Sequence, residues 1–120
     1  MNNYLITYFK VVGDFHFEDF LNDVPVNPSR IITYDGKRFE LHLGYFESQD
    51  RDLINSFEQT LSPLYDYLDK LIEWKDKGAY YKLEVETNME SLKKEFTIIP
   101  FKMAHFLHYT HAYNDDFPVW

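Results

Sequence analysis

The hydrophobic and polar positions along this chain change period several times, and each change marks a predicted element. Over residues 4–12, apolar and aromatic residues occupy both alternating sets of positions, so both faces are largely apolar and a central strand is predicted. Gly13 is expected to end this strand. Apolar residues then recur at helical spacing over residues 17–24, which predicts a short helix with Asp14 as its N-cap.

The clearest local pattern is a β-hairpin around Asp35-Gly36, a residue pair typical of two-residue type I′ turns. Residues 31–34 and 37–46 form its strands, and a two-residue loop pairs Ile32 with Phe39. Alternation along the second strand places its large apolar residues on one buried face, and this face carries Phe39, Leu41, Leu43 and Tyr45.

A long helical pattern covers residues 52–77, where apolar residues step by three and four positions. Ser62-Pro63 lies in its middle, and a proline inside a helix costs about 3 kcal/mol. We therefore expect a kink or two helices, with Ser62 capping the second helix and Pro63 at its first position. Gly78 is the expected C-terminal cap.

Two further strands are predicted at residues 81–87 and 92–99, joined by a turn. A last helix is predicted at residues 101–112, and residues 114–120 read as an irregular tail. The resulting fold class is α+β, a single domain over residues 1–120. It has one antiparallel-dominated sheet of about five strands with helices on one side, in the order β-α-β-β-α-β-β-α.

Composition and charge narrow the classes of partner. The chain of 120 residues has net charge -8 and no cysteine, so neither disulfides nor thiolate metal sites are available. An excess of carboxylates argues against binding nucleic acid through its phosphates. The N-terminus lacks a basic segment followed by an apolar run, and no apolar run approaches the roughly 20 residues of a membrane span. We therefore expect a cytoplasmic protein with no cofactor.

Aromatic residues are abundant, with 10 Tyr, 11 Phe and 2 Trp. Most Phe, together with Tyr45 and Tyr81, fall on core positions. Tyrosine and tryptophan are enriched at protein interfaces, so the remaining ones are candidates for contact with a partner. These remaining residues are Tyr67, Trp74, Tyr109, Tyr113 and Trp120, and the apolar C-terminal residues either fold back or contact a partner.

Four carboxylates in the second half of the long helical pattern repeat at i, i+3, i+7 and i+10. This acidic stripe (Asp66, Asp69, Glu73 and Asp76) lies nearly opposite the apolar stripe of the same helix. Tyr67 and Trp74 fall on one flank. Such a surface suits a basic, partly apolar partner, although any amphipathic helix also exposes a polar face. The predicted partner-binding residues are Asp66, Tyr67, Asp69, Lys70, Glu73, Trp74 and Asp76.

The histidines offer the best alternative chemistry. His105, His108 and His111 step three apart, and Asp115 or Asp116 could complete a metal-ligand set. Side chains at this spacing diverge around a helix, whereas zinc needs ligands that converge on one point. No nucleophile or phosphate-loop motif is present. We therefore expect no metal site and no catalytic activity, and keep a small enzyme that uses His16, His42 or this histidine group as an alternative.

One stretch of the chain adds a resemblance. Residues 39–46, Phe-Glu-Leu-His-Leu-Gly-Tyr-Phe, precede an amphipathic helix in a small, acidic, cysteine-free α+β chain. This layout resembles immunity proteins of bacterial toxin–immunity systems, including those of contact-dependent growth inhibition. The resemblance implies a cytoplasmic protein that binds one cognate toxin, often a nuclease, and blocks its active site. A generic protein-interaction domain without an inhibitory role is the alternative.

Overall fold

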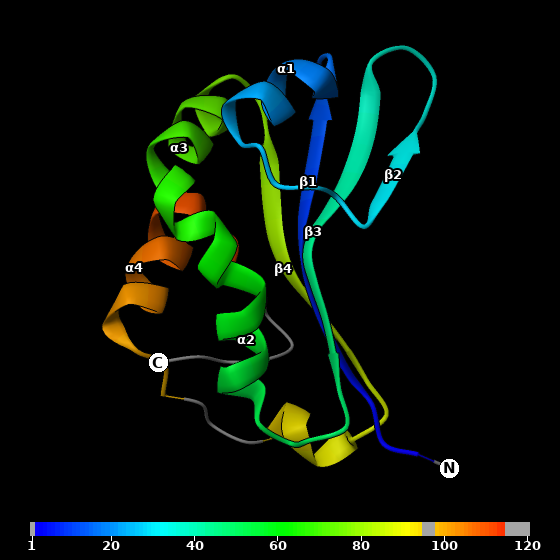
Figure 1. Ribbon diagram of the computed structural model, residues 1–120, viewed down its shortest axis with the longest axis vertical. Coiled ribbons are helices and arrows are strands. Elements are labelled where there is room, and N and C mark those ends of the chain that lie inside the picture. Colours follow the sequence, from blue (N-terminus) through cyan, green and yellow to red (C-terminus); the bar gives the residue numbers. More distant parts are fainter. Residues whose placement is uncertain (1, 95–97, 115–120) are drawn as a thin grey trace.

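A four-stranded antiparallel sheet forms one layer of the protein, and helices form the other (Figure 1). The structure is a computed structural model that describes residues 2–94 and 98–114. The sheet order is β2-β3-β1-β4, with strands β1 (Leu5–Asp14), β2 (Arg30–Thr33), β3 (Arg38–Ser48) and β4 (Tyr80–Thr87). The helical elements are α1 (Phe17–Asp23), α2 (Leu53–Leu61), η1 (Ser62–Tyr67), α3 (Leu68–Asp76), η2 (Glu90–Lys94) and α4 (Phe101–Thr110).

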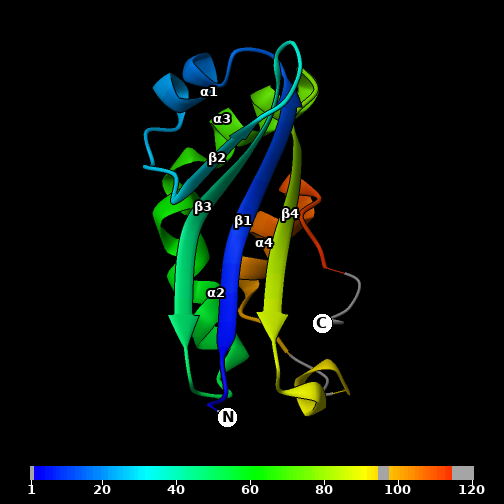
Figure 2. The ribbon, with the colours of Figure 1, turned by 90° about the vertical axis from the view of Figure 1, so that its right-hand side faces the viewer.

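The helices cover one face of the sheet and leave the other face open (Figure 2). The α+β class, with one antiparallel sheet and helices on one side, is therefore as predicted. The fifth strand is not found in the described part of the chain. Leu92 is buried within the 3-10 helix η2, and residues 98–100 are irregular, while residues 95–97 of the predicted strand lie outside the described residues.

Strand β1 is central, as its sequence predicts, and it pairs with β3 on one side and β4 on the other. The strand continues through Gly13 to Asp14, because these residues still pair with Phe39 and Arg38 of β3. The prediction that Gly13 ends the strand and Asp14 caps α1 is therefore wrong. His16 holds the N-cap position of α1, and its side chain makes no capping hydrogen bond.

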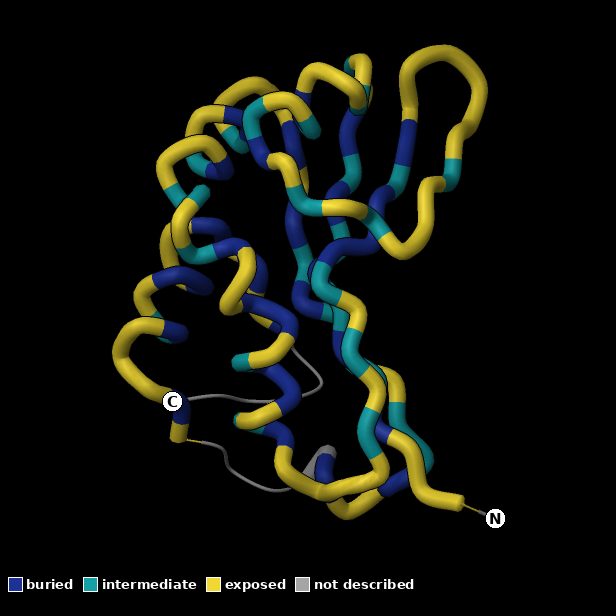
Figure 3. Tube along the Cα trace, viewed as in Figure 1, coloured by how far each residue is buried: buried dark blue, intermediate teal, exposed yellow. Residues whose placement is uncertain are grey.

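The hairpin of β2 and β3 forms where predicted, but its register differs by one residue. Thr33 pairs with Phe39, and the Tyr34 amide donates to the Arg38 carbonyl oxygen at 2.9 Å. The loop therefore holds three residues instead of two. The hairpin tip is exposed (Figure 3), so no core contact enforces the two-residue turn.

A β-bulge interrupts the pairing of β1 and β3. Thr7 pairs with Phe46 and Phe9 with Leu43, so two residues of β3 oppose Tyr8 alone. The bulge reverses the alternation, and Tyr45 is 48% exposed instead of buried. The prediction that Tyr45 belongs to the core is therefore wrong, whereas Phe39, Leu41 and Leu43 are buried as expected.

The predicted break in the long helix is present at Ser62-Pro63. A 3-10 segment, η1, separates α2 from α3, and Pro63 lies in its first positions. Ser62 adopts helical dihedral angles at the end of α2 and makes no capping hydrogen bond to η1, so its predicted capping role is wrong. Gly78 follows α3 as predicted. The Ala79 amide donates to the Trp74 carbonyl and the Gly78 amide to that of Lys75, which together form a Schellman motif.

One hydrophobic cluster joins the sheet to the helical layer. Its buried residues include Phe9, Phe39 and Tyr81 from the sheet and Phe57 and Phe106 from the helices. The Tyr81 hydroxyl donates to the Leu71 carbonyl oxygen at 2.6 Å, which satisfies the buried polar group. In the described residues, no helix has the length and apolar character needed to cross a bilayer.

Candidate partner-binding surface

The acidic stripe lies on the outer surface of η1 and α3. Leu71 and Leu64 are fully buried against the core, and the four carboxylates of the stripe are exposed on the side away from them. The stripe thus lies on the helical layer, on the opposite side of the molecule from the open face of the sheet (Figure 1).

Few cations neutralise the stripe. Lys70 Nζ lies 3.4 Å from Glu73 Oε2, but both side chains are about half exposed, and such pairs are worth about 0–1 kcal/mol. Among the described residues, Asp66, Asp69 and Asp76 have no ion-pair or hydrogen-bond partner. Three carboxylates of the stripe are therefore free to meet a cationic group.

Trp74 is buried, so its predicted exposure on the flank of the stripe is wrong. It is 8% exposed, and its ring lies 4.7 Å from Phe15 and 5.9 Å from Phe20, measured between centroids. The indole Nε1 donates to Asp23 Oδ2 at 2.8 Å. Lys77 Nζ lies 4.5 Å from the indole ring centroid. Trp74 therefore anchors α1 to α3.

Tyr67, the other aromatic residue of the predicted surface, is half-buried and packs against the core. The helical spacing places Tyr67 and Trp74 on one flank, but it contains no information that α1 docks against that flank. The surface that remains from the prediction is therefore acidic, with Lys70 at its edge.

Helix α1 makes a polar contact with α3 that the helical spacing of the sequence does not predict. Asp19 and Asp23 lie four positions apart on the same side of α1, and Asp23 reaches α3 through its hydrogen bond with Trp74. Asp23 belongs to the packing of the two helices. The sequence around Asp23 contains no pattern that predicts its contact with α3.

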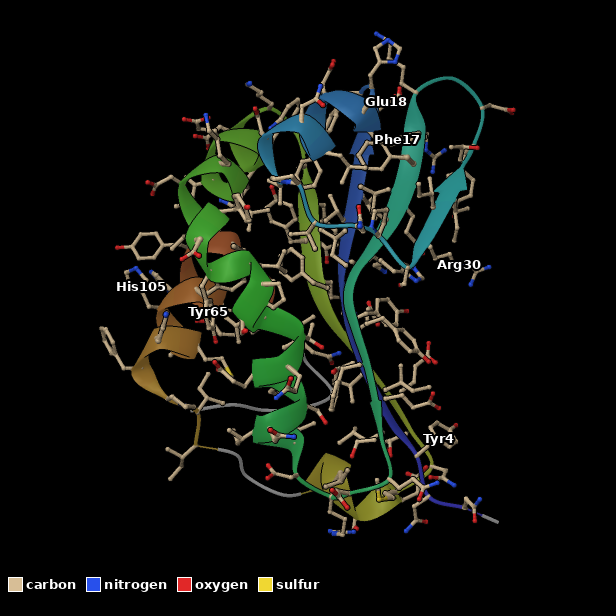
Figure 4. All side chains as sticks on the ribbon, in the orientation of Figure 1. Tyr4, Phe17, Glu18, Arg30, Tyr65 and His105 are labelled. Atoms are coloured by element: carbon tan, nitrogen blue, oxygen red, sulfur yellow. The ribbon has the colours of Figure 1, made fainter. Side chains whose placement is uncertain are left out.

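The three histidines of α4 and its C-terminal end lie on the surface. His105, His108 and His111 are all exposed, and the ring centroids of His108 and His111 are 6.5 Å apart. Figure 4 shows His105 on the outer side of α4. Within residues 2–94 and 98–114, no three His, Cys, Asp or Glu side chains are placed to hold a metal ion. Asp115 and Asp116, the further candidate ligands, lie outside the described residues.

The other surplus aromatic residues have different positions. Tyr109 is 47% and Tyr113 is 41% exposed. The ring of Tyr109 lies 4.7 Å from that of His105, measured between centroids. Trp120 and the rest of the apolar tail lie outside the described residues.

Comparison of the chain with protein-family models, with curated proteins and with solved structures finds no match in any of the three. The function proposed below therefore rests on the chemistry of the surface and on the resemblance in layout.

Proposed function

We propose that this protein is an immunity-type inhibitor, which binds and neutralises a basic toxin domain through the acidic stripe of η1 and α3. The observation that supports the proposal is the set of exposed carboxylates at Asp66, Asp69 and Asp76, which have no cationic partner among the described residues. The protein contributes binding and no chemistry of its own, and it acts in the cytoplasm.

A physical reason connects this surface with a basic partner. The chain carries a net charge of -8, so its field accelerates the approach of a positively charged domain. The stripe then places carboxylates one and two helical turns apart, which suits several Lys or Arg side chains of one partner. The ion pair between Lys70 and Glu73 does little to prevent partner binding, because an exposed ion pair of this kind is weak and Glu73 can pair with a cation of the partner instead.

The gene beside this one provides the direct test. We expect it to encode a toxin, and expression of that toxin's catalytic domain should stop growth of a host strain. Co-expression of this protein should restore growth, and the two purified proteins should form a complex. Normal growth arrest in the presence of this protein, or the absence of a toxin gene beside it, would contradict the proposal. Binding without protection would instead indicate an interaction domain with no inhibitory role.

Salt dependence tests the electrostatic part of the proposal. Between about 0.01 M and 1 M NaCl the Debye length falls from about 30 Å to about 3 Å. The association rate of the complex, measured by stopped-flow fluorescence, should fall steeply over this range. An association rate that does not change with salt would show that the stripe does not guide the encounter.

A further inference from the structure

The open face of the sheet carries a second acidic and aromatic site. Ile6 of β1 pairs with Glu47 of β3 and with Glu86 of β4, so the three residues form one row across three strands. Paired residues point to the same face, and adjacent strands lie about 4.8 Å apart. Two carboxylates therefore flank an apolar residue, with their backbones about 10 Å apart.

Two adjoining hollows meet over this row. One has a volume of about 730 Å³ and is lined by Tyr4, Ile6, Glu47 and Glu86, among others. The other has a volume of about 380 Å³ and shares Ile6 and Glu86, with Tyr8, Tyr45 and His42 on its walls. We call the two hollows together the Ile6 hollow. Tyr45 reaches it because the β-bulge turns this side chain to the open face.

The two carboxylates of the row are contacted by tyrosine hydroxyls and not by cations of the described residues. Among the described residues neither Glu47 nor Glu86 has an ion-pair partner, and Glu86 receives only a long hydrogen bond of 3.4 Å from the Tyr8 hydroxyl. His42 is 8% exposed and stacks on Tyr8 with centroids 4.2 Å apart. Its Nε2 lies 2.6 Å from Glu40 Oε2.

Two lysines near the hollow are paired with a carboxylate, and one arginine belongs to its lining. Lys10 and Lys82 lie two rows further along the open face, beyond Tyr8 and Glu84, and both contact Glu84 Oε1, at 3.1 Å and 3.8 Å. Arg30 lines the smaller hollow from β2. Figure 4 shows that Arg30 projects outward from the sheet near the middle of the molecule, whereas Tyr4 lies near its lower end.

We propose that the Ile6 hollow binds the guanidinium group of an arginine from a basic protein segment. The two carboxylates accept hydrogen bonds from its N–H groups, and Tyr45, with the face of Tyr8 that does not stack on His42, contacts the planar cation. Arginine fits better than lysine, because its flat, weakly hydrated head stacks on aromatic rings and bonds to carboxylates on two sides.

The tyrosines give independent support for a negative potential in the hollow. Desolvation, and then the carboxylates of Glu86, Glu84 and Glu40, raise the pKa of Tyr8 to about 12. Partial desolvation, followed by Glu47 and Glu86, also raises the pKa of Tyr45. The carboxylate part of these shifts reflects a negative field that also stabilises a bound cation, whereas desolvation, the largest cause, disfavours any charge.

This site goes beyond the proposed function, because it lies on the opposite layer from the acidic stripe. A globular domain bound on α3 leaves the Ile6 hollow open. The arginine therefore belongs to a second basic segment, and the site is tested without the toxin.

The probe is N-acetyl-arginine amide, titrated into the ¹⁵N-labelled protein and followed by NMR. We expect saturable shifts in the backbone amides of Ile6, Tyr45 and Glu86. The matched control is N-acetyl-citrulline amide, which has the same shape without the charge, and it should bind at least about tenfold more weakly. The Glu47→Gln, Glu86→Gln double variant should weaken arginine binding by a similar factor.

Three results would overturn the proposal. These are equal shifts with citrulline, unchanged arginine binding in the double variant, or shifts confined to α3. Arg30→Ala separates a cation site from an anion site. This change should leave arginine binding intact or tighten it. If N-acetyl-glutamate amide instead binds the wild-type protein and no longer binds Arg30→Ala, the hollow is an anion site and the proposal is wrong. Each outcome is independent of whether a toxin binds the acidic stripe.

Discussion

Gly44 shows how one residue shapes both the packing and the surface. It has φ of 64°, and a Cβ atom at this position would overlap the Thr60 carbonyl oxygen of α2. The helix approaches the sheet closely here, where the Thr7 and Thr60 hydroxyl oxygens lie 2.6 Å apart. The same residue forms the bulge that turns Tyr45 outward. Gly44 therefore permits the close approach of α2 to the sheet and, through the bulge, places Tyr45 on the open face.

Replacing Gly44 by alanine should destabilise the fold by about 3 kcal/mol or more, from the left-handed backbone and the clash together. Gly36→Ala is the matched control, because Gly36 has φ of 73° with nothing within 4 Å of an added Cβ. It should lose only about 1–2 kcal/mol. Urea unfolding measures both changes, and equal losses would show that Thr60 does not crowd this site.

Tyr8 should make stability fall in alkali. Its pKa is raised from 10.0 to about 12, so the folded chain keeps this proton at a pH where the unfolded chain loses it. The stabilisation is complete below pH 10 and is lost as the pH approaches 12. Burial also raises the pKa of Tyr65 and Tyr81, so other tyrosines contribute above pH 10.

Urea unfolding at a series of pH values tests the contribution of Tyr8. Tyr8→Phe should lose less stability than the wild-type protein between pH 10 and pH 12. Parallel curves for the two proteins over this interval would contradict the raised pKa.

At the scale of elements, the docking of α1 against α3 depends on one polar contact inside an aromatic cluster. Trp74 packs between Phe15 and Phe20, and its indole N–H reaches Asp23 at the end of α1. A hydrogen bond to a charged group is worth about 1.5–3 kcal/mol. This contact removes Trp74 from the surface and fixes α1 beside the acidic stripe.

A double-mutant cycle measures this contact. Asp23→Ala should lower the free energy of unfolding by about 1–2 kcal/mol in the wild-type protein, and by much less when Trp74 is already Phe. Asp19→Ala, on the same side of α1, is the control and should show no coupling to Trp74. Additive losses for Asp23 and Trp74 would mean that the hydrogen bond does not hold the helices together.

The sequence predicts elements better than their contacts. The apolar spacing of residues 52–77 and the proline within it indicate two helical pieces, because period and proline geometry are local properties. Residues 92–99 are predicted to form a strand, yet Leu92 is buried in a 3-10 turn. For such a short apolar run, tertiary packing decides whether it forms a strand or a helical turn.

For the candidate surfaces too, local features are predictable from the sequence and tertiary contacts are not. The acidic stripe is visible in the sequence, because its spacing depends on one helix alone. The burial of Trp74 and the exposure of Tyr45 are not visible, since they require the position of α1 and the bulge at Gly44. The row of Glu47, Ile6 and Glu86 brings together three strands that are far apart in the sequence.

At the scale of the whole molecule, the two layers present different acidic surfaces. The helical layer exposes the acidic stripe with one weak ion pair. The open face of the sheet combines carboxylates with tyrosines in the Ile6 hollow. A net charge of -8 favours the approach of basic partners from either side, but local geometry selects what binds.

The affinity of charge-reversal variants for the proposed toxin partner tests the central claim most directly. Asp69→Lys with Glu73→Lys reverses the middle of the stripe. Asp35→Lys with Glu90→Lys reverses two exposed carboxylates elsewhere and changes the net charge equally. Calorimetric titration should show Kd weakened about 100-fold or more by the first pair, through direct repulsion, and less than about tenfold by the second. Equal effects of the two pairs, or no effect of either, would contradict binding through the acidic stripe.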